Sequence, residues 1–223
     1  MGVLRPPSDL RFWTVPMDND NLGSTPMAHH YGISPSILLS FLYGFYGAAC
    51  SSFLTAIIQL VMPDIFILLP YDKNRRKIYE TVYHECAHAS HYSQVGNTYW
   101  QKFVSRIIDN SILYALNPNV DSYGTGSEPD AGYIGVGEIW GNYFGARCMF
   151  QRFGDNGNFL SDYSWFKPGF LMDLHVQGNL YDQQLFGCFS SNINSIIKLR
   201  DELLWRFPDR TALINARYNY YYQ

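Results

Sequence analysis

One stretch constrains this chain more than any other: residues 78–93 (IYETVYHECAHASHYS) contain the pattern H-E-x-x-H, with His84, Glu85 and His88. On an α-helix, residues four apart lie one above the other, so His84 and His88 can direct two imidazole nitrogens at one metal ion. Glu85 then lies beside the metal, where it can take a proton from a water whose pKa a bound zinc ion lowers to about 7. The pattern therefore predicts a helix with two zinc ligands and a general base, and a second element that supplies one more ligand.

The residues before this helix support the metal-binding interpretation. Residues 64–70 (DIFILLP) form a short apolar run that ends in proline and predicts a buried strand. Residues 71–77 are polar and basic and predict a turn. A strand, a polar turn and a helix that carries H-E-x-x-H are the context expected of a zinc hydrolase. The alternative is an ordinary amphipathic helix with exposed histidines, which needs no metal.

The composition is that of a folded protein. Hydrophobic residues make up 47% of the 223 residues and charged residues only 16%, which argues against disorder and allows a substantial core. We expect one domain over residues 1–223, with an irregular N-terminal segment over residues 1–33. The net charge of −3 and the lack of a basic run argue against nucleic-acid binding. His29 and His30 are expected at the surface, since no other metal-binding residue type accompanies them at ligand spacing.

An uncharged stretch raises a membrane alternative. Residues 37–62 are long enough to span a bilayer, and residues 31–62 contain no charged residue or histidine. Interspersed Ser, Gly, Thr and Gln residues lower the hydropathy, and no basic flank follows at once. One or two buried helices that pack on the motif helix are therefore favoured over a membrane-associated protein anchored through residues 37–62.

The N-terminus lacks the basic segment followed by an apolar segment that a signal peptide has. We therefore expect either an intracellular protein or an exported one whose leader is not part of this sequence. The low charge and the many Tyr, Asn and Ser residues favour export. The sequence leaves the oligomeric state open.

Helical patterns dominate the rest of the chain. Residues 95–97 (VGN) predict the end of the motif helix, and apolar residues at helical spacing predict a second helix over residues 99–116. Residues 117–136 hold many turn formers and predict a long loop that forms a wall of a substrate cleft. Residues 196–207 predict a further helix that Pro208 ends, and residues 212–222 predict a final aromatic-rich helix or tail.

Glu138 is the favoured third zinc ligand. It is predicted to open an apolar helix, and its small neighbours Gly137 and Gly141 would let that helix approach the first one. Catalytic zinc keeps three protein ligands and one open position, and a carboxylate at this place would complete the set. The alternative is that Glu138 only complements the positive N-terminal end of the helix dipole.

Together, the two helices resemble the gluzincin metallopeptidases, the thermolysin-like clan, in which H-E-x-x-H is followed by a downstream helix bearing a glutamate. The resemblance implies a Zn2+ ion held by His84, His88 and Glu138, with Glu85 as the general base. It also implies hydrolysis of a peptide or protein substrate.

The resemblance covers residues 64–93 and 132–153 and leaves the remainder of the chain unmatched. The family often carries an aspartate four residues after the glutamate, which hydrogen-bonds a ligating histidine. This sequence departs from the pattern with Asn142, whose side-chain carbonyl can still accept an imidazole N–H. Residues 83–92 (YHECAHASHY) are also similar to small bacterial zincin-like proteins without assigned substrates.

Another histidine competes as a third ligand. His91 lies on the same helix face as His88, but the metal would lie between the first two histidines, so a side chain one turn further on points past it. We expect His91 beside a ligand or at the surface. The metzincin pattern would place its third histidine at position 94, where this chain has Gln94.

Three residues are candidates for stabilising the oxyanion of a tetrahedral intermediate. His175 follows the glutamate helix, where gluzincins often carry a histidine or tyrosine with this role. Most single histidines in apolar segments are instead satisfied core residues. Tyr123 and Tyr133 are comparable candidates.

The sequence thus predicts a mostly helical α+β fold, a zincin-like domain with a small sheet beside the H-E-x-x-H helix. The favoured function is a zinc metallopeptidase. The first alternative is a zinc-containing domain without turnover that serves as a binding or structural module. The second is the membrane-associated protein described above.

Overall fold

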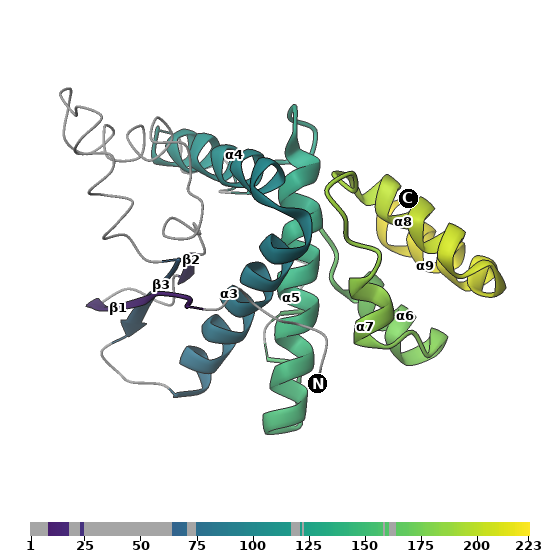
Figure 1. The fold of residues 1–223 in the computed structure, drawn as a ribbon, viewed down its shortest axis with the longest axis horizontal. Coiled ribbons are helices and arrows are strands. Elements are labelled where there is room, and N and C mark those ends of the chain that lie inside the picture. Colours follow the sequence, from purple (N-terminus) through teal and green to yellow (C-terminus); the bar gives the residue numbers. More distant parts are fainter. Residues whose placement is uncertain are drawn as a thin grey trace.

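The computed structural model describes residues 9–17, 23–24, 64–70, 75–116, 121, 123–157, 159–160 and 164–223. Within these residues the fold is mostly helical, as predicted (Figure 1). The elements follow in the order β1 (Phe12–Met17), β2 (Gly23–Ser24), β3 (Ile65–Pro70), α3 (Arg75–Val95), α4 (Asn97–Leu116), α5 (Ala131–Phe153), α6 (Gly169–Gly178), α7 (Asp182–Phe186), α8 (Ile196–Arg206), η1 (Pro208–Arg210) and α9 (Thr211–Tyr222).

Two of the sequence predictions fall outside the described residues: the helical or membrane-spanning stretch over residues 37–62, and the pair His29 and His30. Within the part of the chain that the structure describes, none of the helices combines the length and the apolar character needed to span a membrane.

The described strands form a three-stranded sheet in the order β1-β3-β2, in which β3 pairs in parallel with β1 and antiparallel with β2. The prediction of an irregular segment over residues 1–33 was therefore wrong for residues 12–17. Their aromatic and β-branched residues favour a strand, and Pro16 is tolerated because β1 lies at the edge of the sheet that the described strands form. Ile65 and Ile67 of β3 are buried, and β3 packs against α3, so the sheet lies beside the motif helix.

Two antiparallel helices, α3 and α5, form the centre of the described structure (Figure 1). At one end of the pair the ring of Tyr79 contacts the ring of Phe153. Toward the other end the indole N–H of Trp140 donates to Ser90 Oγ at 3.3 Å. The face of α3 that carries the motif histidines therefore looks onto α5 rather than onto solvent.

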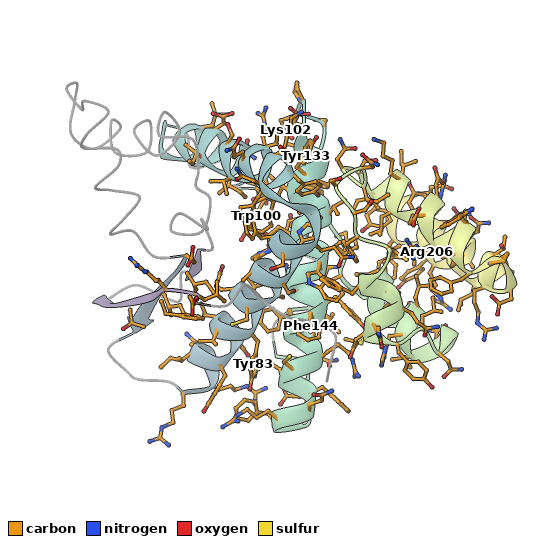
Figure 2. All side chains as sticks on the ribbon, in the orientation of Figure 1. Tyr83, Trp100, Lys102, Tyr133, Phe144 and Arg206 are labelled. Atoms are coloured by element: carbon orange, nitrogen blue, oxygen red, sulfur yellow. The ribbon has the colours of Figure 1, made fainter. Side chains whose placement is uncertain are left out.

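A sharp turn at Gly96 joins α3 to α4. Gly96 has a φ of 79°, a left-handed conformation that favours glycine, and the predicted end of the motif helix is confirmed. Trp100 lies on α4, near the turn that joins this helix to α3 (Figure 2). Its ring stacks on that of Phe103 with centroids 4.5 Å apart, and both rings lie against the ring of His88. Helix α4 thereby supplies an apolar wall beside the motif.

The prediction of a loop over residues 117–136 was wrong for its last six residues, because α5 begins at Ala131. Gly132, one of the turn formers that indicated a loop, lies inside this helix, whose neighbours leave no room for a Cβ. A Cβ at Gly132 would lie 2.2 Å from the carbonyl oxygen of Asn194. Glu138 consequently lies about two turns inside α5, and the interpretation that it complements a helix N-terminus does not apply.

The C-terminal elements α6 to α9 lie beyond α5 from the sheet (Figure 1). The helix predicted over residues 196–207 is confirmed as α8, and residues 212–222, predicted as a helix or a tail, form helix α9. Ser195 caps α8 by accepting a hydrogen bond from the backbone N–H of Lys198 at 3.2 Å. The core that joins these layers includes the fully buried side chains of Trp100, Trp140, Tyr143, Phe170, Leu171, Leu174, Phe189 and Leu203.

Candidate metal centre

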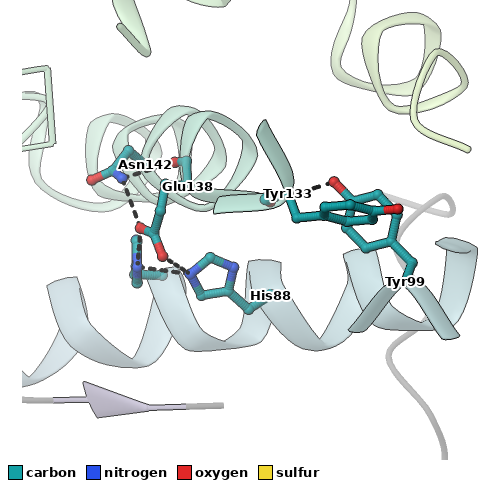
Figure 3. Close-up of polar contacts among 6 residues, drawn as sticks. His88, Tyr99, Tyr133, Glu138 and Asn142 are labelled. Carbon is teal, nitrogen blue, oxygen red and sulfur yellow. Dashed lines mark hydrogen bonds and ion pairs between the residues drawn. The ribbon is translucent and has the colours of Figure 1, made fainter. Parts of the chain in front are cut away.

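The side chains of His84, His88 and Glu138 converge between α3 and α5. Figure 3 shows Glu138 directed from α5 toward His88 on α3. The Nε2 atoms of His84 and His88 are 2.9 Å apart. Glu138 directs Oε2 toward His84 Nε2 at 3.4 Å and Oε1 toward His88 Nε2 at 3.3 Å. His88 and Glu138 are each only 3% exposed. The prediction that these three residues lie together is confirmed, and the group they form can hold a metal ion.

The spacing of the three side chains fits a zinc ion. Two ligand atoms at roughly 2.0–2.1 Å from a tetrahedral zinc lie roughly 3.3 Å apart. Each histidine has an oxygen of Glu138 at about this distance, but a different oxygen in each case, and the two imidazoles are closer together, so a single ion would need small rotations of the three side chains. Two imidazoles and one carboxylate are also a donor set of catalytic zinc sites, which keep one position open.

Burial and mutual attraction determine the charge of these groups. Burial alone would raise the pKa of Glu138, but the charge of His88 and hydrogen bonds with both histidines hold that pKa well below its ordinary value. Burial alone would lower the pKa of His84, but the hydrogen bond and charge of Glu138 outweigh it and raise the pKa. Glu138 is therefore ionised at neutral pH, and a metal ion that binds here would compete with protons for His84.

Gly141 lets α5 approach the two histidines. It lies almost one turn after Glu138, on the same face of the helix. A Cβ at this position would lie 2.8 Å from Cε1 of His88, which is closer than real Cβ contacts allow. It would lie 3.0 Å from Cε1 of His84, which is at the limit of such contacts. The missing side chain of Gly141 thus leaves both rings free to reach Glu138.

We expect Gly141→Ala to weaken zinc binding by about 10–100-fold, the range seen when a group that supports a ligand is lost. The added methyl group would push the rings away from Glu138 while all three ligands remain. Affinity would be measured by competition with a chromogenic chelator. Gly178→Ala adds the same methyl group at the end of α6, against the side chain of Leu213 rather than against a ligand, and should leave the affinity unchanged. An unchanged affinity in Gly141→Ala would show that the close approach is not needed.

Aromatic rings surround the two imidazoles. The ring of Phe159 stacks on His84 with centroids 5.8 Å apart and an interplanar angle of 6°. The ring centroids of Trp100 and Phe103 lie 5.8 and 5.5 Å from that of His88. These contacts restrict the orientation of both imidazoles and keep water away from the α4 side, which strengthens electrostatic interactions at the site.

Two further polar residues lie close enough to the ligands to act on them electrostatically. Glu85 is 4% exposed, and its charge acts on His84 and on Tyr123. The charge of Glu138, burial and the charge of Glu85 together hold the pKa of the Tyr123 phenol well above its ordinary value. Such a phenol keeps its proton at neutral pH and can donate a hydrogen bond to an oxygen that gains negative charge. Tyr123 is therefore the candidate for oxyanion stabilisation on which the charges of Glu138 and Glu85 act.

The structure does not bring His175 or Tyr133 to the three ligands. His175 lies on α6, where its Nδ1 is 2.9 Å from the carbonyl oxygen of Leu180 and 3.7 Å from Asp182 Oδ1. Tyr133 packs against Tyr99 with ring centroids 4.7 Å apart, away from Glu138 (Figure 3). The polar contacts of His175 tie it to the chain around α7, so the predicted oxyanion role of His175 is not supported.

Asn142 contacts Glu138 rather than a histidine. Its Nδ2 donates to the carbonyl oxygen of Glu138 at 2.8 Å and to Glu138 Oε2 at 3.4 Å (Figure 3). The prediction that its side-chain carbonyl accepts an imidazole N–H is therefore not supported. Residues four apart on one helix are neighbours, so the amide reaches the carboxylate of its own helix first. Asn142 can thereby orient the carboxylate of Glu138.

His91 is buried and does not lie at the surface. Its ring is 0% exposed and packs edge-on against Tyr99, Trp100 and Phe189. Neither ring nitrogen has a hydrogen-bond partner among the described residues. Burial and the charge of His88 lower the pKa of His91 to about 3, so the ring is neutral. His91 does not join the ligand group, in keeping with the prediction that it points past the metal.

The chain can also be compared with known proteins. Comparisons with protein-family models, with curated proteins and with solved structures gave no match. The resemblance to the gluzincins therefore stays a prediction. The ligand assignment is carried by the geometry and chemistry of the side chains themselves.

Proposed function

We propose that this chain is a zinc-dependent hydrolase, and specifically a metallopeptidase with a zincin-like domain. One observation carries the proposal: two histidines of an H-E-x-x-H helix and a glutamate of a second helix converge within 4.8 Å, a donor set of catalytic zinc sites. The choice of the peptide bond as the substrate follows the resemblance to the gluzincins.

In the proposed mechanism, His84, His88 and Glu138 would hold the metal, which supplies Lewis-acid polarisation of the substrate carbonyl and lowers the pKa of a water. Glu85 accepts the proton of the attacking water and later delivers it to the leaving amine, as a general base and then a general acid. Tyr123 donates a hydrogen bond to the carbonyl oxygen as negative charge develops there. The raised pKa of the phenol keeps it a donor throughout.

A second candidate function has one observation in its favour. His88, Glu138 and Glu85 are all 4% exposed or less, so a zinc ion held here would be largely enclosed. A zinc ion in such a position can stabilise a domain that binds a partner and has no turnover.

Metal removal tests both functions. The purified chain, loaded with zinc, would be incubated with a random peptide library and the products read by mass spectrometry. We expect cleavage that stops after treatment with 1,10-phenanthroline and returns when zinc is added. A lower melting temperature after metal removal, without cleavage at any stage, would support the structural module. Failure of the chain to retain zinc would contradict both.

A further inference from the structure

Trp165 connects the loop that carries Tyr123 to the helix that carries Glu138. Its indole N–H donates to the backbone carbonyl of Tyr123 at 3.2 Å. Its ring lies over two glycines, Gly126 in the loop and Gly135 in α5. One side chain thus touches both elements that bring polar groups to the candidate metal centre.

Both glycines are required for this contact. A Cβ on Gly126 would lie 2.6 Å from Cδ2 of Trp165, and a Cβ on Gly135 would lie 2.4 Å from its Cη2. Neither position accepts a side chain while the indole stays in place. Gly135 lies three residues, less than one turn, before Glu138, so the ring rests on the part of α5 that positions this ligand.

The rest of the loop is held by its own hydrogen bonds. We call residues 121 and 123–130 the Tyr123 loop. Glu128 accepts from the backbone N–H groups of Thr125 (2.8 Å) and Gly126 (2.9 Å), and Asp121 accepts from the backbone N–H of Tyr123 at 2.7 Å. These hydrogen bonds restrain the loop internally. The ring of Tyr123 also packs edge-on against that of Phe166, the residue after Trp165, with centroids 5.3 Å apart, so the segment of Trp165 and Phe166 contacts the loop where it carries this phenol.

We propose that Trp165 is a positioning residue, which holds the Tyr123 loop against α5 and so sets the place of the Tyr123 phenol relative to Glu85 and Glu138. This inference rests on the proposed function, in which Tyr123 stabilises the oxyanion. Trp165 itself acts through Tyr123, by the hydrogen bond to its carbonyl and by the ring contacts with the two glycines.

Hydrogen exchange on the metal-free chain tests the anchoring independently of metal and activity. Trp165→Phe keeps an aromatic ring but loses the N–H, and we expect peptides of the Tyr123 loop to exchange about tenfold faster, the factor for one lost hydrogen bond of ordinary strength. Trp140→Phe is the matched control, since it loses an indole N–H that is bonded to Ser90 instead. Unchanged exchange of the loop in Trp165→Phe, or an equal increase in Trp140→Phe, would overturn the inference.

A double-mutant cycle tests whether Trp165 acts through Tyr123. The probe is acetohydroxamate, whose affinity for the cobalt-loaded protein is read from the visible absorption of the metal. We expect Trp165→Phe and Tyr123→Phe each to weaken binding about tenfold, and the double variant to bind no more weakly than Tyr123→Phe alone. Losses that multiply in the double variant would overturn the positioning role. If the wild-type protein bound cobalt but not the probe, the proposed function would fail, and the exchange experiment would still decide whether Trp165 anchors the loop.

Discussion

Replacing Glu138 by alanine should remove stoichiometric zinc from the protein. Wild type purified without added metal is expected to carry close to one zinc per chain, whereas Glu138→Ala should lose most of it. The variant keeps His84 and His88 but lacks the carboxylate whose two oxygens lie 3.3 and 3.4 Å from their Nε2 atoms. Removal of a ligand should cost more affinity than the roughly 10–100-fold lost with a supporting residue. Elemental analysis of both proteins provides the measurement.

A matched control separates this effect from the loss of any buried or paired glutamate. Glu202→Ala removes a carboxylate that pairs with Arg206 on α8, and its zinc content should equal that of wild type. A full zinc complement in Glu138→Ala would show that another residue is the third ligand. A wild-type chain that binds no zinc, even when zinc is supplied, would refute the metal centre altogether.

Replacing Glu85 by glutamine should abolish hydrolysis while zinc stays bound. Glutamine has the same shape but does not take up a proton at neutral pH, so the attacking water would lose its base. General acid–base catalysis contributes about 10²–10⁴-fold, and we expect a loss in kcat of about 10³-fold with little change in zinc content. The measurement combines elemental analysis with the rate of cleavage of a peptide found in the library screen.

Glu80→Gln provides the control for this variant on the same helix. Glu80 is also buried on α3, but it lies 3.7 Å from Arg76, near the start of that helix. Its replacement should leave both zinc content and turnover unchanged. A Glu85→Gln protein with wild-type turnover would exclude Glu85 as the base, and one that had lost its zinc would show that Glu85 maintains the site instead.

The grouping of the metal ligands could be predicted because it depends on short-range regularity. His84 and His88 are four residues apart, and a helix places such residues on one face whatever surrounds it. Glu138 was identified because the chain has few glutamates and because this one has small neighbours. The structure confirms that its carboxylate lies beside the two histidines. The start of its helix was placed too late, however, because a single sequence does not distinguish glycines that break a helix from glycines that let it pack closely.

The other site residues depend on tertiary packing that local patterns do not encode. Tyr123 lies in a loop without periodicity, and its place near Glu138 follows from the anchor at Trp165. Tyr133 is five residues before Glu138 on α5, so it points about 140° away from it on an ideal helix. Tyr133 can be excluded as a site residue on this ground only when the true start of α5 is known. His175 was a candidate only because it follows the glutamate helix in the sequence. In the structure it contacts Leu180 and Asp182 instead.

The arrangement of α3, α4 and α5 has a consequence for how the proposed metal centre would be filled. The two histidines and Glu138 belong to helices separated in sequence by the whole of α4, so neither helix alone carries a complete ligand set. The full site exists only after the chain has folded back on itself, and an ion that binds there favours that folded arrangement over open ones. Zinc binding would then indicate that folding is complete. A newly synthesised chain would lack the full set of ligands until α5 had packed against α3.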